Sequence, residues 1–184
     1  MSLLPRTAVL IGGACSGKTT LWTALCQGPL ASSIDPVPEA ARILLQGGFP
    51  PPPPEMSPDF RQWAIPFQSA VLHLQLTLEQ LAHERAVKDQ RPIKLCDRGI
   101  YDAIAYHPYG TMCLPQYGEY PDRMGTRYHT VFLLDQLLDQ LTTQCDAIRH
   151  ESISRAKLQH QHLIDAWSGH PRIITVPALS LQER

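Results

Sequence analysis

Residues 12–19 carry a complete G-x-x-x-x-G-K-(S/T) sequence, which lies between an apolar run and a helical pattern. Glycine at positions 12 and 17 lets the backbone curl, so that successive N–H groups point inward at a helix N-terminus and can hold an anion. The run 7–11 is typical of a buried strand, and residues 20–25 are typical of the helix that follows. The segment therefore predicts a phosphate loop that binds a nucleoside triphosphate together with Mg²⁺.

Within this loop, Lys18 is expected to reach the β- and γ-phosphates, and the Thr19 hydroxyl is expected to ligate Mg²⁺. ATP is the expected nucleotide and GTP is the alternative, because the chain has no N-K-x-D-type sequence that would read the base. The residues predicted to bind the nucleotide are Gly12, Gly13, Ala14, Cys15, Ser16, Gly17, Lys18, Thr19 and Thr20.

Length and composition narrow the class of protein. A chain of 184 residues suits one α/β domain and is too short for two, so we treat 1–184 as a single domain. A net charge of -1 with interspersed signs argues against a partner that is a nucleic acid or a membrane. With no apolar run of about 18 residues and no signal-peptide layout, we expect a cytoplasmic protein. The eight histidines show no metal spacing, and we interpret them as surface or packing residues.

Strand and helix patterns alternate along the chain. Extended segments are expected at 7–11, 33–37, 92–97, 130–135 and 172–176. Helices are expected after the phosphate loop, at 39–45, from Ser57 to about Lys88, and at 152–167. Strands separated by helices predict an α/β protein with a parallel, doubly wound sheet whose ligands bind at the carboxyl ends of the strands.

The long helix from Ser57 carries apolar residues at three- and four-residue spacing, among them Phe60, Trp63 and Phe67. We interpret this apolar stripe as core packing and not as a cofactor site. Residues 50–54, just before the helix, are consecutive prolines. They predict a rigid polyproline loop, and a recognition motif for an SH3-like partner is the alternative.

Acidic residues stand where two of the strands end. Asp97, with Arg98 and Gly99 after it, closes the strand at 92–97, and we predict that it holds Mg²⁺ through water. Arg98 is then expected to be free to clamp an anionic or hydroxylated acceptor. Asp135 fits the same strand-then-acid pattern and is the alternative metal-side acid; we favour Asp97 because Arg98 adjoins it.

Sequence blocks at 12–20, 37–42, 97–106, 128–134, 146–149, 176–177 and 183–184 span nearly the whole chain. On these blocks the chain resembles the small kinase-like P-loop NTPases of the AAA-domain predicted-ATPase family, and it is similar to nicotinamide-riboside and deoxynucleoside kinases. The resemblance implies a three-layer fold around a five-stranded parallel sheet in the order 2-3-1-4-5. It also implies a mobile lid near residues 137–155, around Arg149. Nucleoside kinases usually have a serine or tyrosine where this chain has Gly99.

The resemblance also suggests roles for two charged residues. In deoxynucleoside kinases a glutamate after the second strand acts as base toward the sugar hydroxyl, and Glu39 matches that position. The alternative is that Glu39 only stabilises the dipole of the helix it begins. Arg149 would neutralise charge on the transferred phosphoryl group, and a surface arginine is its alternative.

Together these features favour a kinase that transfers the γ-phosphate of ATP to a small metabolite, nucleoside-like or otherwise hydroxylated. We expect it to be a monomer or a homodimer. The alternative is a regulatory ATP- or GTP-binding switch, or a slow ATPase, that acts through a protein partner at residues 50–54 or 106–125. The predicted catalytic residues are Lys18, Glu39, Asp97, Arg98 and Arg149.

Overall fold

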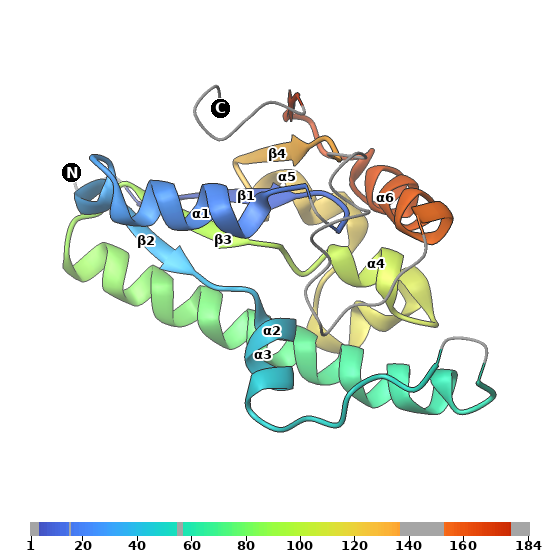
Figure 1. Ribbon diagram of the computed structural model, residues 1–184. Helices are drawn as coiled ribbons and strands as arrows, with labels where there is room; N and C mark the ends of the chain where they lie inside the picture. The colour runs from blue at the N-terminus through green and yellow to red at the C-terminus, as the bar shows by residue number, and fades with distance from the viewer. Residues whose placement is uncertain (1–3, 15, 55–56, 137–152, 178–184) are drawn as a thin grey trace.

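The structure is a computed structural model that describes residues 4–14, 16–54, 57–136 and 153–177 (Figure 1). The strands of this part of the chain are β1 (Arg6–Ile11), β2 (Ile34–Val37), β3 (Ile93–Asp97), β4 (Thr130–Leu134) and β5 (Ile173–Val176). Its α-helices are α1 (Lys18–Gln27), α2 (Ala40–Gln46), α3 (Phe60–Lys88), α4 (Asp102–Tyr106), α5 (Met124–Arg127) and α6 (Ile153–Trp167). Short 3-10 turns are η1 (Ala31–Ser33), η2 (Gly110–Cys113), η3 (Pro115–Tyr117) and η4 (Pro121–Arg123).

The strands of the described residues form one five-stranded sheet in the order β2-β3-β1-β4-β5. Every neighbouring pair is parallel, and β1 lies in the centre between β3 and β4. The predicted fold class and strand order are therefore confirmed. Because all strands run the same way, the segments that follow β1, β2, β3 and β4 emerge at one edge of the sheet.

Alternate residues of β1 face opposite sides of the sheet, as the period of a strand requires. Val9 and Ile11 belong to a large buried cluster to which α3 contributes Leu72. Leu10 belongs to a second cluster, against which Trp22 of α1 packs. Figure 1 shows the same arrangement, with α1 on one side of the sheet and α3 on the other. The result is a three-layer α/β fold.

The helix α3 differs from its sequence-based prediction at its start. It begins at Phe60 with Asp59 as the N-cap, and the Ser57 hydroxyl accepts a hydrogen bond from the Asp59 N–H at 3.2 Å. Pro66 lies inside the helix, in its second turn. In the described part of the chain, no helix is both long enough and apolar enough to cross a membrane.

Candidate functional site

The phosphate loop connects the carboxyl end of β1 to the first turn of α1. Gly12 and Gly17 have φ angles of 146° and 77°, which side-chain-bearing residues rarely adopt. Gly17 is the N-cap of α1, so the loop lies at a helix N-terminus, where unpaired N–H groups favour an anion. Cys15, also predicted to bind the nucleotide, lies outside the described residues.

The side chain of Lys18 is folded over this loop. Its Nζ donates to the Gly13 carbonyl at 2.6 Å and to the Ser16 hydroxyl at 3.0 Å, and the residue is 7% exposed. The Gly13 N–H donates to Nδ1 of His160 at 3.0 Å, so this amide faces α6 and is not directed at a phosphate. The loop therefore places one buried cation at the predicted phosphate position, and α6 packs against it.

Thr19 and Asp97 meet beside the loop, although they are far apart in the sequence. The Thr19 hydroxyl donates to Oδ2 of Asp97 at 2.8 Å, and within the described residues Oδ1 of Asp97 has no hydrogen-bond partner. Burial, and then the charge of Glu39, raise the pKa of Asp97 above its ordinary value, against the opposing effect of Lys18. A hydroxyl and a carboxylate with one unpartnered oxygen fit Mg²⁺, which would favour the charged form of the acid.

Replacing Asp97 by asparagine is expected to reduce Mg²⁺-dependent turnover more than Asp135→Asn does. Asp97 contacts Thr19, whereas Asp135 lies half-buried after β4. Since burial disfavours the charge of Asp97, its loss should leave the melting temperature without ligand unchanged or slightly raised. Thermal-shift and ADP-release assays with and without Mg²⁺ measure both effects. A larger loss of turnover in Asp135→Asn would assign the metal-side acid to β4 instead.

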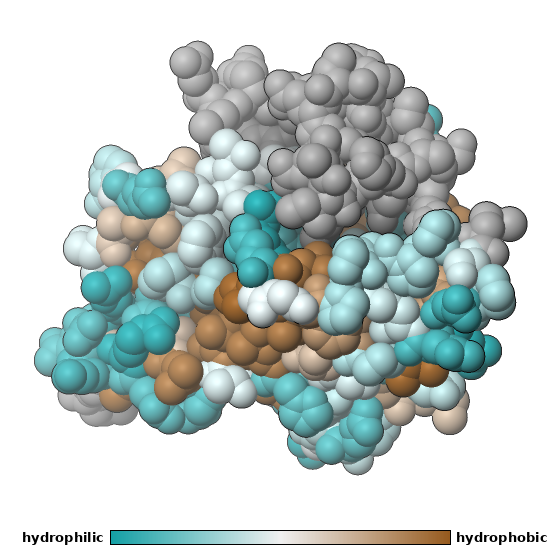
Figure 2. Space-filling model, turned by 60° about the horizontal axis from the view of Figure 1, so that its bottom comes forward, coloured by the Kyte–Doolittle hydropathy of each residue, from teal (hydrophilic) through white to brown (hydrophobic). Residues whose placement is uncertain are grey.

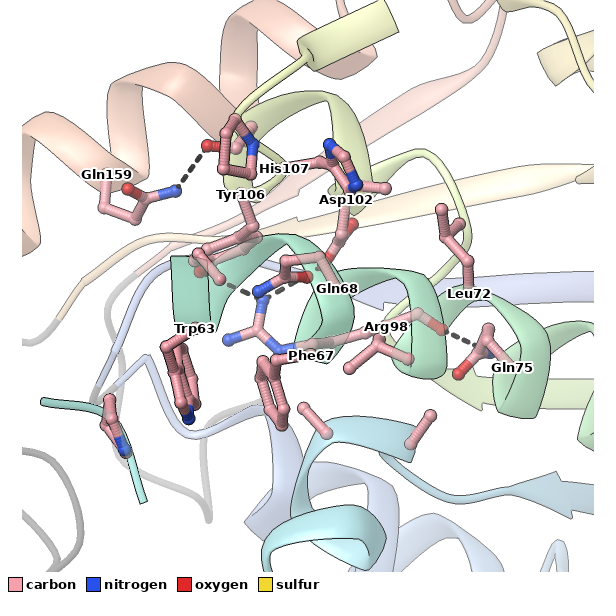
Figure 3. Close-up of a pocket in the computed structure, with 18 of the residues that line it drawn as sticks. Trp63, Phe67, Gln68, Leu72, Gln75, Arg98, Asp102, Tyr106, His107 and Gln159 are labelled. Carbon is pink, nitrogen blue, oxygen red and sulfur yellow. Dashed lines mark hydrogen bonds and ion pairs between the residues drawn. The ribbon is translucent and has the colours of Figure 1, made fainter. Parts of the chain in front are cut away.

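Arg98 lies at the centre of a buried charge cluster. Its φ of 76° is unusual for a residue with a side chain, and it follows β3 directly. Its Nε contacts Oε1 of Glu39 at 2.9 Å, and its Nη1 contacts Oδ2 of Asp102 at 3.0 Å. The guanidinium also lies over the Tyr106 ring, 5.3 Å from its centroid (Figure 3). Two carboxylates therefore hold Arg98, and its expected contact with an acceptor stays a prediction.

Asp102 is a member of this cluster that the sequence interpretation did not single out. It is 5% exposed, and its second oxygen accepts a hydrogen bond from Nε1 of Trp167 at 2.8 Å. Burial raises the pKa of Asp102, while Arg98 and Trp167 act to lower it. Arg98 precedes α4 and has a left-handed backbone, so the spacing of four residues does not reflect a shared helix face and no local pattern predicted this contact.

Packing explains the glycine at position 99. A Cβ atom there would lie 2.9 Å from the Tyr128 hydroxyl and 3.0 Å from the Trp167 ring. Both aromatic side chains are fully buried, so neither has room to withdraw. The absence of the serine or tyrosine found in nucleoside kinases therefore follows from close contact with these two rings.

A cavity of about 940 Å³ adjoins the charge cluster. Glu39, Arg98 and Asp102 line it together with Ala14 of the phosphate loop, so it borders the predicted nucleotide site. Opposite these residues, the first half of α3 forms the wall of the cavity. Figure 2, turned toward this side, shows hydrophobic surface gathered at the centre of the face. A small molecule in the cavity would lie next to the phosphate loop.

The aromatic part of the wall corrects the interpretation of the apolar stripe as core alone. Trp63 and Phe67 line the cavity, and their rings stack with centroids 4.5 Å apart. Nε1 of Trp63 donates to the Pro50 carbonyl at 2.8 Å, which ties the proline loop to α3. Pro52, Pro53 and Pro54 also line the cavity. The rigid polyproline loop is thus part of the cavity wall.

Some predicted site features fall outside the part of the chain that the structure describes. Arg149 is one of them, and so is most of the predicted lid at 137–155. From Ile153 onward α6 is described, and Gln159 of this helix lines the cavity. The structure thus brings together Lys18 and four further predicted site residues, Thr19, Glu39, Asp97 and Arg98.

The parallel sheet in this strand order, with a G-x-x-x-x-G-K-T loop between β1 and α1, defines a P-loop NTPase fold. A family model described as "AAA domain" matches residues 7–184, so the chain belongs to this AAA-domain family of nucleotide-binding P-loop proteins. P-loop domains typically bind their nucleotide with Mg²⁺. No curated protein matches the chain. The expected similarity to nicotinamide-riboside and deoxynucleoside kinases rests on the sequence blocks alone and stays a prediction.

Proposed function

We propose that this protein is a Mg²⁺-dependent kinase that transfers the γ-phosphate of ATP to a hydroxyl group of a small, nucleoside-like or otherwise hydroxylated acceptor. The observation that carries the proposal is the cavity of about 940 Å³ beside the phosphate loop. Cavities of roughly 300–1,000 Å³ are typical of small-molecule sites. A protein that only hydrolyses ATP needs room for a water molecule, whereas this cavity has room for a second substrate.

The residues around the loop suggest a division of roles. Lys18, with Mg²⁺ held by Thr19 and Asp97, would neutralise charge on the β- and γ-phosphates. Glu39 would orient the acceptor hydroxyl and take its proton as the oxygen attacks the γ-phosphorus. Arg98 is held between Glu39 and Asp102, and in this proposal it keeps the Glu39 carboxylate in place. Arg149 would add positive charge to the transferred group.

The chemistry of the cavity favours a flat, uncharged alcohol as the acceptor. The stacked rings of Trp63 and Phe67 offer an apolar surface on which a planar group can lie. A phosphorylated acceptor would need a cation of its own, but the buried guanidinium of Arg98 already has two carboxylate partners. Among the described residues of the wall, the other arginine is Arg61, which is exposed.

A screen of acceptors, scored by ADP release with ATP and Mg²⁺, tests this function. Nucleosides and other aromatic alcohols should stimulate turnover, and their monophosphates should not. GTP in place of ATP tests the choice of nucleotide in the same assay. Stimulation by the monophosphates alone would contradict the charge argument, and a lack of stimulation by any small molecule would contradict the kinase proposal.

The alternative is a regulatory nucleotide-binding switch or slow ATPase, and one observation favours it. The segment between α4 and α5 exposes large apolar side chains, of which Met112 is 80% exposed. Tyr109 and Tyr120 of the same segment are also exposed. Exposed apolar groups of this kind can form a protein-binding surface. ADP release that responds only to a protein partner would favour the switch.

A further inference from the structure

The contact between α6 and the phosphate loop has no part in the proposed chemistry. Nδ1 of His160 accepts a hydrogen bond from the Gly13 N–H at 3.0 Å. The carbonyl of the same glycine accepts a hydrogen bond from Nζ of Lys18 at 2.6 Å. Gly13 is therefore held at its N–H by the helix and at its carbonyl by the lysine that is predicted to meet the phosphates.

The packing around Gly13 shows that the contact is close. A Cβ atom at position 13 would lie 3.1 Å from Cβ of His160 and would collide with the amide of Gln136. The Gln136 amide donates to the Ala14 carbonyl at 3.3 Å and to the Ala156 carbonyl at 3.1 Å, so it ties the loop to α6 a second time. The motif does not specify the residue at position 13, and a side chain there would have to displace the Gln136 amide.

The position of α6 is set by contacts elsewhere in the fold. Trp167 at its end is fully buried and donates to Asp102, and Leu163 is fully buried as well. The Gln159 amide donates to the Ala105 carbonyl of α4 at 3.0 Å (Figure 3). Because these contacts anchor the helix without the loop, the helix can serve as a fixed support against which the loop is shaped.

We propose that His160 is a positioning residue of the nucleotide site, which acts through Gly13 to hold the phosphate loop and Lys18 in the conformation that binds the triphosphate. This role concerns nucleotide binding alone. It goes beyond the proposed kinase reaction and does not depend on it.

The hydrogen bond requires a lone pair on Nδ1, so His160 must be neutral. Burial, as the largest effect, lowers the pKa of His160; Asp135 acts to raise it and Lys18 to lower it further. Lys18 of the loop and Asp135 after β4 are the charged groups that face the ring in the described residues. Since the folded pKa lies below the ordinary value of 6.5, the contact is complete above that pH and is lost as the pH falls through the folded pKa.

Two substitutions separate the hydrogen bond from the bulk of the ring. In His160→Asn, the amide oxygen stands three bonds from Cα, as Nδ1 does, and it can accept from Gly13 at any pH. In His160→Ala the acceptor is gone. We expect His160→Ala to weaken binding of a non-hydrolysable ATP analogue with Mg²⁺ about two- to tenfold, the range for one hydrogen bond. His160→Asn should bind close to wild type.

Titration calorimetry from pH 7.5 down to the lowest pH at which both proteins stay folded supplies the second readout. As the pH falls through the folded pKa of His160, wild-type affinity should fall more than the affinity of His160→Asn, and protonation of the nucleotide itself cancels because it is common to both. The control is Gln161→Ala, since Gln161 is exposed on the same helix and its amide bonds only Asp165 among the described residues. It should bind as wild type does over the whole pH range.

Three results would overturn the proposal. They are wild-type affinity in a folded His160→Ala variant, an affinity of His160→Asn as low as that of His160→Ala, or the same pH response in wild type and His160→Asn. If His160→Ala does not fold, the comparison of the pH responses of wild type and His160→Asn still tests the proposal. None of these results bears on the kinase proposal, which the acceptor screen tests separately.

Discussion

Lys18→Ala is expected to remove the stabilisation that ATP with Mg²⁺ gives the protein, and to reduce turnover at least about a hundredfold. Lys18 is the buried cation of the phosphate loop, and no other group of the loop can supply its charge to the β- and γ-phosphates. A ligand at a hundred times its Kd adds about 2.7 kcal/mol to the free energy of unfolding. Thermal-shift measurements with and without ATP and Mg²⁺ will therefore resolve the loss.

The melting temperature without ligand distinguishes this effect from unfolding. The hydrogen bonds that Nζ of Lys18 donates to Gly13 and Ser16 lie within the loop itself, so their loss should cost little stability. Lys88→Ala is the matched control, because Lys88 is exposed at the far end of α3. That variant should keep the full response to ATP. Full stabilisation and full turnover in Lys18→Ala would show that the nucleotide binds elsewhere.

Strand periodicity and one motif were enough to predict the α/β fold class with its parallel sheet. The run at 7–11 and the motif that follows it identify β1, the loop and α1, because a helix must begin where Gly17 ends the turn. Parallel strands bring their carboxyl ends to one edge, which is why Asp97 was expected near Thr19 and lies 2.8 Å from its hydroxyl. The strand order came from the resemblance to P-loop proteins and not from the pattern itself.

What the sequence could not show is which side chains meet across long separations. Glu39 and Arg98 are 59 residues apart in the sequence, and Gly13 and His160 are 147 residues apart. No local spacing therefore predicts either contact. The stripe on α3 illustrates a second limit. The spacing of apolar residues identifies the side of a helix that faces the protein interior. It does not distinguish a residue that packs in the core, such as Leu72, from one that lines a cavity, such as Trp63.

Glu39→Gln is expected to lower acceptor-dependent turnover by roughly 10² to 10⁴ while ATP affinity stays near wild type, because the amide keeps the shape but cannot take a proton. Glutamine can still accept a hydrogen bond from Nε of Arg98, although the ion pair at 2.9 Å is lost. Some loss of stability, about 1–3 kcal/mol, is therefore expected as well. Titration calorimetry measures the affinity for ATP. ADP release with the best acceptor from the screen measures turnover.

Asp102→Asn is the matched comparison for Glu39→Gln, because it removes the other carboxylate that holds Arg98. If Glu39 serves only to anchor Arg98, the two variants should lose similar amounts of turnover. If Glu39 takes the proton of the acceptor, Glu39→Gln should lose far more than Asp102→Asn, and its loss should appear in kcat. A helix-start acid without a chemical role would behave differently from both, with a cost of about 0.3–1 kcal/mol in stability and almost unchanged turnover. That last result would remove Glu39 from the catalytic residues and favour the regulatory alternative.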